Sequence, residues 1–162
     1  MGKSGTPGFR RSAYGGELEH MFFGKYEHSI DDKGRMTIPV RFREALETGA
    51  YITHGFDRNL VVYTTSYLNT LSEKVRGMSN TDPDARLLRR LLFSSAALLE
   101  FDKAGRILIP QFLRDAVDIQ SNAIVIGVGD YFEIWSPSNW EAQNALLDDA
   151  ENNIQRFSAL DL

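Results

Sequence analysis

Two stretches of the sequence, IDDKGRMTIPVRFREAL (30–46) and FDKAGRILIPQFLRDAV (101–117), decide the fold because one is a copy of the other. At an offset of 71 residues, seven of the seventeen aligned positions are identical. The identities are Asp31 with Asp102, Gly34 with Gly105, Arg35 with Arg106, Ile38 with Ile109, Pro39 with Pro110, Arg43 with Arg114 and Ala45 with Ala116. An internal copy is the signature of a fold assembled from repeated units. We therefore expect two related structural units in one chain.

The first unit begins with a predicted hairpin. Asp31 favours a turn, and Gly34 adopts a positive φ without steric cost. Pro39 has no backbone N–H to donate, so the strand before it ends there and a short helix follows. The expected order is a strand at 25–30, a turn at 31–34, a strand at 35–38, a helix at 40–47, a strand at 51–54, a turn at 55–59 and a strand at 60–63.

The second unit repeats this order, with strands expected at 106–109, 124–127 and 131–135. Four short strands and one small helix bury too little apolar surface to be stable alone. We therefore expect an α+β fold, mainly β, in which the two units interleave into a single pseudo-symmetric barrel. The expected segments are a flexible N-terminal extension or tag (1–20), a first repeat (25–68), a connecting helical segment (69–95), a second repeat (96–140) and a C-terminal helix with its tail (141–162).

Two helices outside the units are also expected. Asp82 and Pro83 suit the cap and first position of a connecting helix, whose apolar stripe extends to about Leu99. Ser138 suits the cap of a C-terminal helix with acidic residues opposite its apolar stripe. The two stripes comprise Leu87, Leu88, Leu91 and Leu92, and Trp140, Leu147, Ala150, Ile154 and Phe157. We expect the C-terminal helix to pack on its own barrel. The alternative is that this stripe, or the Leu87 stripe, packs against a neighbouring subunit.

Composition sets the outer limits. The 162 residues are 43% hydrophobic, enough for a buried core, and contain no cysteine, which excludes disulfides and thiolate metal sites. The formal net charge of −4 excludes attraction of the whole chain to nucleic acid. No apolar run is long enough to suggest a membrane span, and we expect a cytoplasmic protein.

The duplicated motif, together with MFFGKYEHSIDDKGRMTIP (21–39) and IGVGDYFEIW (126–135), resembles the MraZ family of bacterial transcriptional regulators. The resemblance covers Met21 to about Trp140. It implies kinship with the AbrB/SpoVT proteins, and hence a swapped-hairpin (double-split) barrel. It further implies a nucleoid-associated regulator of the division and cell wall gene cluster, acting as a repressor on repeated promoter elements of double-stranded DNA as a homo-oligomeric ring.

The distribution of charge favours the same function. The segment 33–43 carries four basic residues and no acid, and the segment 103–114 carries three and no acid. Residues 1–114 hold 17 bases and 13 acids, whereas residues 115–162 hold 1 base and 9 acids. This separation allows a basic face to meet phosphates while the acidic end is turned away.

The candidate DNA-binding residues are Lys33, Arg35, Arg41 and Arg43, with Lys103 and Arg106 in the second copy. We expect Asp31, Gly34, Asp102 and Gly105 to fix the turns, with Asp31 and Arg35 forming an ion pair. A guanidinium in such a pair still has donors for phosphate or for a guanine edge. The second copy has Ala104 for Lys33 and Phe112 for Arg41, so the first copy is expected to dominate the DNA contact.

Other functions find little support. His20, His28 and His54 lack metal-ligand spacing, so no metal or cofactor is expected. No residues suggest a nucleophile with its base, so we expect neither an enzyme nor a small-molecule substrate. The alternative to a DNA-binding regulator is an oligomeric scaffold whose basic face binds an acidic protein partner.

Overall fold

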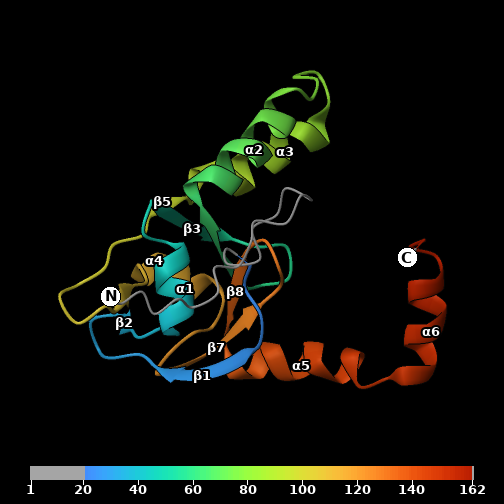
Figure 1. Ribbon diagram of the computed structural model, residues 1–162. Helices are drawn as coiled ribbons and strands as arrows, with labels where there is room; N and C mark the ends of the chain where they lie inside the picture. Colours follow the sequence, from blue (N-terminus) through green and yellow to red (C-terminus); the bar gives the residue numbers. More distant parts are fainter. Residues whose placement is uncertain (1–20, 162) are drawn as a thin grey trace, which may run out of the picture.

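The computed structural model describes residues 21–161, which form fourteen helices and strands (Figure 1). The expected extension or tag at 1–20 lies outside the described residues. The first half contains β1 (Lys25–Ser29), β2 (Arg35–Met36), α1 (Val40–Ala45), β3 (Ala50–His54), β4 (Leu60–Thr64), α2 (Thr65–Arg76) and α3 (Pro83–Ser94). The second half contains β5 (Ala97–Leu98), β6 (Ile107–Leu108), α4 (Gln111–Ala116), β7 (Asn122–Gly127), β8 (Phe132–Trp135), α5 (Pro137–Leu147) and α6 (Ala150–Ser158).

The strands confirm the expected barrel of two interleaved repeats. Six of them form an antiparallel sheet in the order β1-β7-β8-β4-β3-β5, and β2 and β6 form a separate two-stranded ribbon. This order is symmetric about the β8–β4 pair, since β1 is equivalent to β5, β7 to β3 and β8 to β4. The fold is α+β with a pseudo-twofold axis, as expected.

The prediction that the first two strands of each unit pair with one another in a hairpin is wrong. β1 pairs along its whole length with β7 of the second repeat, and β2 pairs with β6. Only an isolated bridge between Ile30 and Met36 joins the two arms of the first turn. The reason is that each repeat, once folded, presents open strand edges that the other repeat fills.

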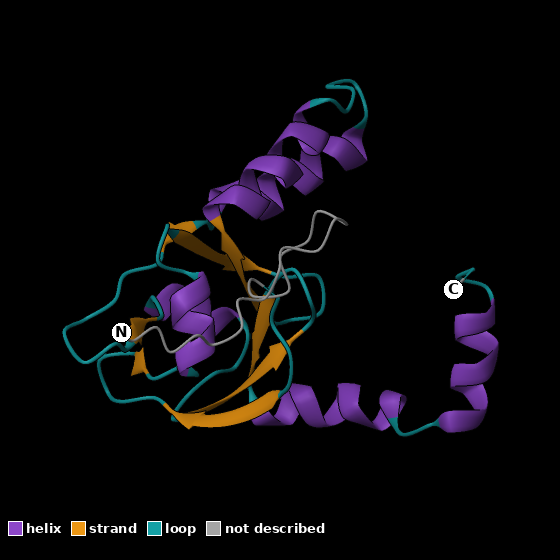
Figure 2. Ribbon diagram, in the orientation of Figure 1, coloured by secondary structure: helices purple, strands orange, loops and turns teal. Residues whose placement is uncertain are grey.

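The core lies between the sheet and the short helices α1 and α4 (Figure 2). Phe42 of α1 and Leu113 of α4 occupy equivalent positions in the two repeats and are 3% and 0% exposed. The ring of Phe42 lies 5.0 Å from the rings of both Phe22 and Phe132, measured between centroids. The side chains of both repeats therefore meet in one core.

The connecting segment is a hairpin of two helices rather than one. The predicted cap is present, because Asp82 Oδ1 accepts a hydrogen bond from the N–H of Asp84. The helix α3 ends at Ser94, five residues before the expected end, and α2 was not expected. Arg89 of α3 joins the two helices by donating to the backbone oxygens of Val75, Arg76 and Met78 at the end of α2. We call residues 65–94 the helical hairpin.

The C-terminal segment, residues 137–161, consists of two short helices and is called the arm. The cap of α5 is Ser136, not Ser138, and its Oγ accepts a hydrogen bond from the N–H of Asn139. The helix stops at Leu147, and α6 begins after Asp149. Figure 1 shows α5 leaving the barrel and α6 standing apart from it. Packing of the whole apolar stripe on its own barrel is therefore not observed.

Candidate nucleic-acid interface

The first turn, residues 31–35, is closed by the carboxylate of Asp31. Its Oδ1 accepts hydrogen bonds from the backbone N–H groups of Lys33 at 3.0 Å and Arg35 at 2.9 Å. Its Oδ2 accepts a charge-assisted hydrogen bond of 2.7 Å from Nε of Arg35. The backbone hydrogen bond from Arg35 is the largest of the effects that lower the pKa of Asp31. Gly34 has a φ of 86°, in the region that favours glycine.

The second turn, residues 102–106, has the same internal bonds. Asp102 accepts from the N–H groups of Ala104 and Arg106 at 2.9 Å each, and from Nε of Arg106 at 2.8 Å. The backbone bond from Arg106 is the largest cause of the lowered pKa of Asp102. Gly105 has a φ of 77°. The identical columns of the sequence repeat thus correspond to one local structure built twice.

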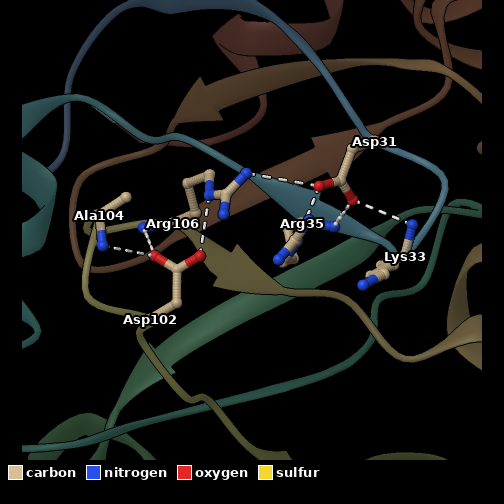
Figure 3. Close-up of polar contacts among 6 residues, drawn as sticks. All are labelled: Asp31, Lys33, Arg35, Asp102, Ala104 and Arg106. Atoms are coloured by element: carbon tan, nitrogen blue, oxygen red, sulfur yellow. Dashed lines mark hydrogen bonds and ion pairs between the residues drawn. The ribbon is translucent and has the colours of Figure 1, made fainter.

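The two turns lie at opposite ends of the β2–β6 ribbon (Figure 3). Because each strand of this ribbon has only two residues, the turns are close to one another. Arg106 reaches across and places Nη1 3.4 Å from Oδ2 of Asp31, while its Nε stays on Asp102. Among the described residues, Arg35 has no such second carboxylate and bonds to Asp31 alone. The guanidinium of Arg106 is therefore shared between two acids, whereas both Nη atoms of Arg35 remain available to a ligand.

The residues of the basic segment 33–43 differ in exposure. Lys33 and Arg41 are exposed, and the side chain of Arg35 is 33% exposed. Arg41 lies in the first turn of α1, whose N-cap is Pro39, while the preceding strand β2 ends at Met36 rather than at the expected residue 38. Three of the four predicted basic residues are therefore accessible to a ligand in the first repeat.

Arg43 occupies a different environment. It is half-buried, and its guanidinium lies so close to Gly105 that a side chain at position 105 would collide with it. Arg114 does the same in the other direction, since a Cβ on Gly34 would lie 2.8 Å from its Nη2. Arg114 Nε also donates to the backbone oxygen of Ile109 at 3.0 Å. Each arginine thus packs on the turn of the opposite repeat.

This packing was not anticipated, although a signal for it existed in the sequence. Arg43 and Arg114 are one of the seven identical columns, whereas Lys33 and Arg41 have no basic counterpart. The retention of this arginine in both copies matches the contact that each copy makes with the turn of the other repeat, Arg43 with Gly105 and Arg114 with Gly34. We accordingly assign Arg43 a structural contribution in addition to its positive charge.

The second repeat presents a less basic surface. Lys103 is exposed and Arg106 is half-buried at the shared ion pair. Several large apolar side chains are exposed on the elements around this turn: Leu98 at 58%, Phe101 at 39%, Leu108 at 43% and Phe112 at 56%. The ribbon register sets Leu108 opposite Arg35. The two repeats therefore share a backbone but offer different chemistry to solvent.

Other polar groups form no second site among the described residues. The rings of Tyr63, Tyr67 and Tyr131 pack together, and burial raises the pKa of each. Burial also lowers the pKa of His28, whose Nδ1 lies 3.2 Å from Thr37 Oγ1. Within residues 21–161, no three His, Asp or Glu side chains are grouped closely enough to hold a metal ion. None of the helices described there has both the length and the apolar character needed to cross a bilayer.

The sequence matches a protein-family model twice. The model is described as "MraZ protein, putative antitoxin-like", and its two matches cover residues 21–91 and 92–160. The boundary between them separates the two repeats identified from the duplicated motif. The family model therefore reports the same internal duplication that the strand order shows.

Curated relatives are similar over most of their length. A protein of Thermomicrobium roseum is 50% identical over 127 residues, which are 78% of this chain and 89% of the relative. Proteins of Roseiflexus castenholzii and Ligilactobacillus salivarius are 44% and 43% identical over 79% and 83% of this chain and 90% and 92% of theirs. Each is named "Transcriptional regulator MraZ". By repeat structure, family model and identity together, the chain belongs to the MraZ family.

Proposed function

We propose that this chain is a transcriptional regulator that binds double-stranded DNA through Lys33, Arg35 and Arg41 of the first repeat. The observation that carries the proposal is the geometry of Arg35. Asp31 holds its Nε at 2.7 Å, which orients the guanidinium and leaves the two Nη groups to donate outward. A guanidinium presented in this way matches the two acceptors of a guanine edge or a phosphate.

The surroundings of Arg35 support the same role. The major groove of DNA admits a two-stranded β-ribbon, and β2–β6 is such a ribbon with a turn at each end. Exposed Lys33 and Arg41 lie on either side of Arg35 in the sequence, where they are suited to phosphates that position the ribbon. Lys103 and Arg106 contribute less, because the second turn lacks basic neighbours and Arg106 is held by two carboxylates.

The finer statement of the proposal concerns assembly and target. One subunit contributes few DNA contacts, so several subunits in a ring would gain affinity by binding spaced promoter repeats at once. The relatives' shared name supports a transcriptional regulator. The sequence resemblance alone implies that it is a repressor of the division and cell wall gene cluster. Such a protein acts in the cytoplasm, at the nucleoid, and needs neither a cofactor nor a small-molecule substrate.

The test is equilibrium binding to the promoter region upstream of the protein's own gene and to a scrambled fragment of equal length, at several salt concentrations. We expect tighter binding to the promoter fragment and an affinity that falls steeply with salt, since Lys and Arg contacts release counterions from phosphates. Equal, salt-insensitive binding to both fragments would refute DNA recognition and favour the scaffold that binds an acidic protein.

Two substitutions of Arg35 separate the reading of bases from the attraction to phosphate. Arg35→Ala is expected to weaken promoter binding by about 1–3 kcal/mol without unfolding the chain. Arg35→Lys keeps the charge but loses the paired donors, so it should reduce the preference for promoter over scrambled DNA more than it reduces the salt dependence. Unchanged affinity in Arg35→Ala would contradict the assignment of this residue.

A further inference from the structure

The arm exposes more apolar surface than a short helical segment in water would be expected to. No residue of α5 or α6 is buried. The exposed side chains are Leu146 at 47%, Leu147 at 56%, Ile154 at 73%, Phe157 at 44% and Leu160 at 64%. A helix of nine residues such as α6 is marginal in water unless it packs on something. Grouped exposed apolar side chains of this kind mark a protein contact.

The apolar surface of α6 is bordered by acids. Ile154 and Phe157 are three residues apart and share a face of the helix, and Glu151 lies one turn before Ile154 on that same face. Asp148 stands at the corner between α5 and α6. From residue 141 to residue 161 there are five acids and one base. We call Glu151, Ile154 and Phe157 the acidic stripe.

The outer face of α3 has the opposite charge. Arg86, Leu87, Arg90 and Phe93 follow one another at spacings of one, three and three residues, which places them on one side of the helix. All four are exposed, with Leu87 at 60% and Phe93 at 36%. The helical hairpin as a whole, residues 65–94, carries five bases and three acids. We call these four residues the basic stripe.

The two stripes do not meet within one chain. Figure 1 shows the helical hairpin and α6 projecting from different sides of the barrel. Each stripe combines large apolar side chains with charges of one sign, and the signs are opposite. Two such helices fit one another by burying the apolar residues between flanking ion pairs.

We propose that the acidic stripe of one copy docks on the basic stripe of α3 in a second copy. Because the two surfaces differ, the contact is head-to-tail, and its repetition yields a closed ring or an open chain of subunits. The inference supplies surfaces for the self-association in the proposed function and rests on that function in this respect. It does not involve the basic segment 33–43, which stays free to bind DNA.

The first test measures assembly size by sedimentation velocity. The double variant Ile154→Asp with Phe157→Asp is expected to shift the protein from assembled species to single subunits. Arg156→Gln is the matched control, because it makes α6 more negative by one charge on the face opposite the stripe and should leave the assembly unchanged. Thermal unfolding of the barrel should be the same in all three proteins, since α6 contributes no residue to the core.

The second test exchanges the charges. Reversal of the basic stripe by Arg86→Glu with Arg90→Glu, or of the arm by Asp148→Arg with Glu151→Arg, is expected to lower the assembled fraction at least tenfold. The chain that carries all four substitutions should recover assembly, because the two surfaces are complementary again. Failure of the fourfold variant to recover, or full assembly of the Ile154/Phe157 variant, would overturn the proposal.

These outcomes are distinct from those of the DNA experiment. Loss of assembly in the arm variants together with residual salt-dependent binding to DNA supports both proposals. Assembly through the arm without any preference for promoter DNA would refute the proposed function and leave this interface standing. Assembly that resists the arm variants but is abolished by Phe112→Asp would place the contact on the second repeat and refute the present inference.

Discussion

In the first repeat the turn at 31–35 is followed by the exposed cation Arg41, whereas in the second repeat the exposed ring of Phe112 stands at the equivalent position. The internal bonds of the two turns agree to within 0.1 Å, from 2.9 to 3.0 Å at the lysine or alanine N–H and from 2.7 to 2.8 Å at the arginine Nε. Side chains that build the turn are thus common to both repeats, and those that face solvent are not. Duplication kept the scaffold and let the surface of each copy acquire its own chemistry.

The largest expected effect concerns what the two repeats share. Phe42→Ala should destabilise the barrel by about 3–5 kcal/mol, since it leaves a cavity between Phe22 and Phe132. Its counterpart Leu113→Ala should cost about 2–5 kcal/mol, because this side chain is also fully buried. Urea denaturation measures both. A loss in only one of the two variants would show that the repeats do not contribute to a single core.

The two turn glycines should differ. A Cβ on Gly34 would lie 2.7 Å from the backbone oxygen of Ile109, whereas a Cβ on Gly105 meets the flexible side chain of Arg43. Both positions have positive φ, which costs an L-residue about 1–2 kcal/mol. We therefore expect Gly34→Ala to destabilise the protein by at least about 2 kcal/mol and Gly105→Ala by about 1 kcal/mol. Equal losses in urea denaturation would show that Arg43 is as immovable as the backbone.

The lysines at the two turns sharpen the comparison for DNA. Lys33→Ala should lower the slope of log affinity against log salt by about one, the change expected for one lost phosphate contact. Lys103→Ala is the matched control and should change the slope less, because the second repeat has Ala104 and Phe112 where the first repeat has the basic residues Lys33 and Arg41. The reverse order would assign the DNA contact to the second repeat.

The smallest expected effect is the pH dependence of the turn carboxylates. Asp31 has a lowered pKa in the folded protein, so its contribution to stability is present above the ordinary value of 3.8 and is lost as the pH falls through the lowered value. Asp31→Asn should therefore lower the Tm at neutral pH, and the difference from the unaltered protein should disappear in acid. Asp102→Asn should have a smaller effect, since Asp31 alone accepts from both Arg35 and Arg106. Thermal scans across pH 2–7 test this order.

The barrel was predictable because its determinants are local and occur twice. The Asp, Gly, Arg and Pro of each motif set a turn and end a strand through short-range chemistry, which a sequence displays directly. The pairing of the strands was harder to predict from the sequence. β1 pairs with β7, almost a hundred residues away, and no feature of residues 25–30 indicates that partner. The sequence could therefore predict that the repeats interleave, but not which strand edge each one fills.

The outer helices and the site show the same division. Hydrophobic spacing predicted the apolar residues of the arm, but it predicted one continuous helix through Asp148 and Asp149, where the structure has a break between α5 and α6. Such spacing also does not indicate which surface packs on the apolar residues. The helix α2 was missed because it follows β4 without a loop. The clustering of basic residues identified Lys33, Arg35 and Arg41 as candidate DNA-binding residues. The contact of Arg43 with Gly105 was not predicted, because it depends on the tertiary fold.

The exchange of strands between the halves has a consequence for how this chain tolerates being divided. A fragment ending before β5 would keep β1 but lose β7, and the ribbon strand β2 would lose β6. The remaining fragment, which begins at β5, would in turn keep β7 and β6 but lose their partners β1 and β2. Neither of the two fragments could complete its own sheet, but each carries the strands with which the other pairs. Co-produced fragments should thus recombine into a nicked barrel, and a lone fragment should persist only by capturing a second molecule of itself.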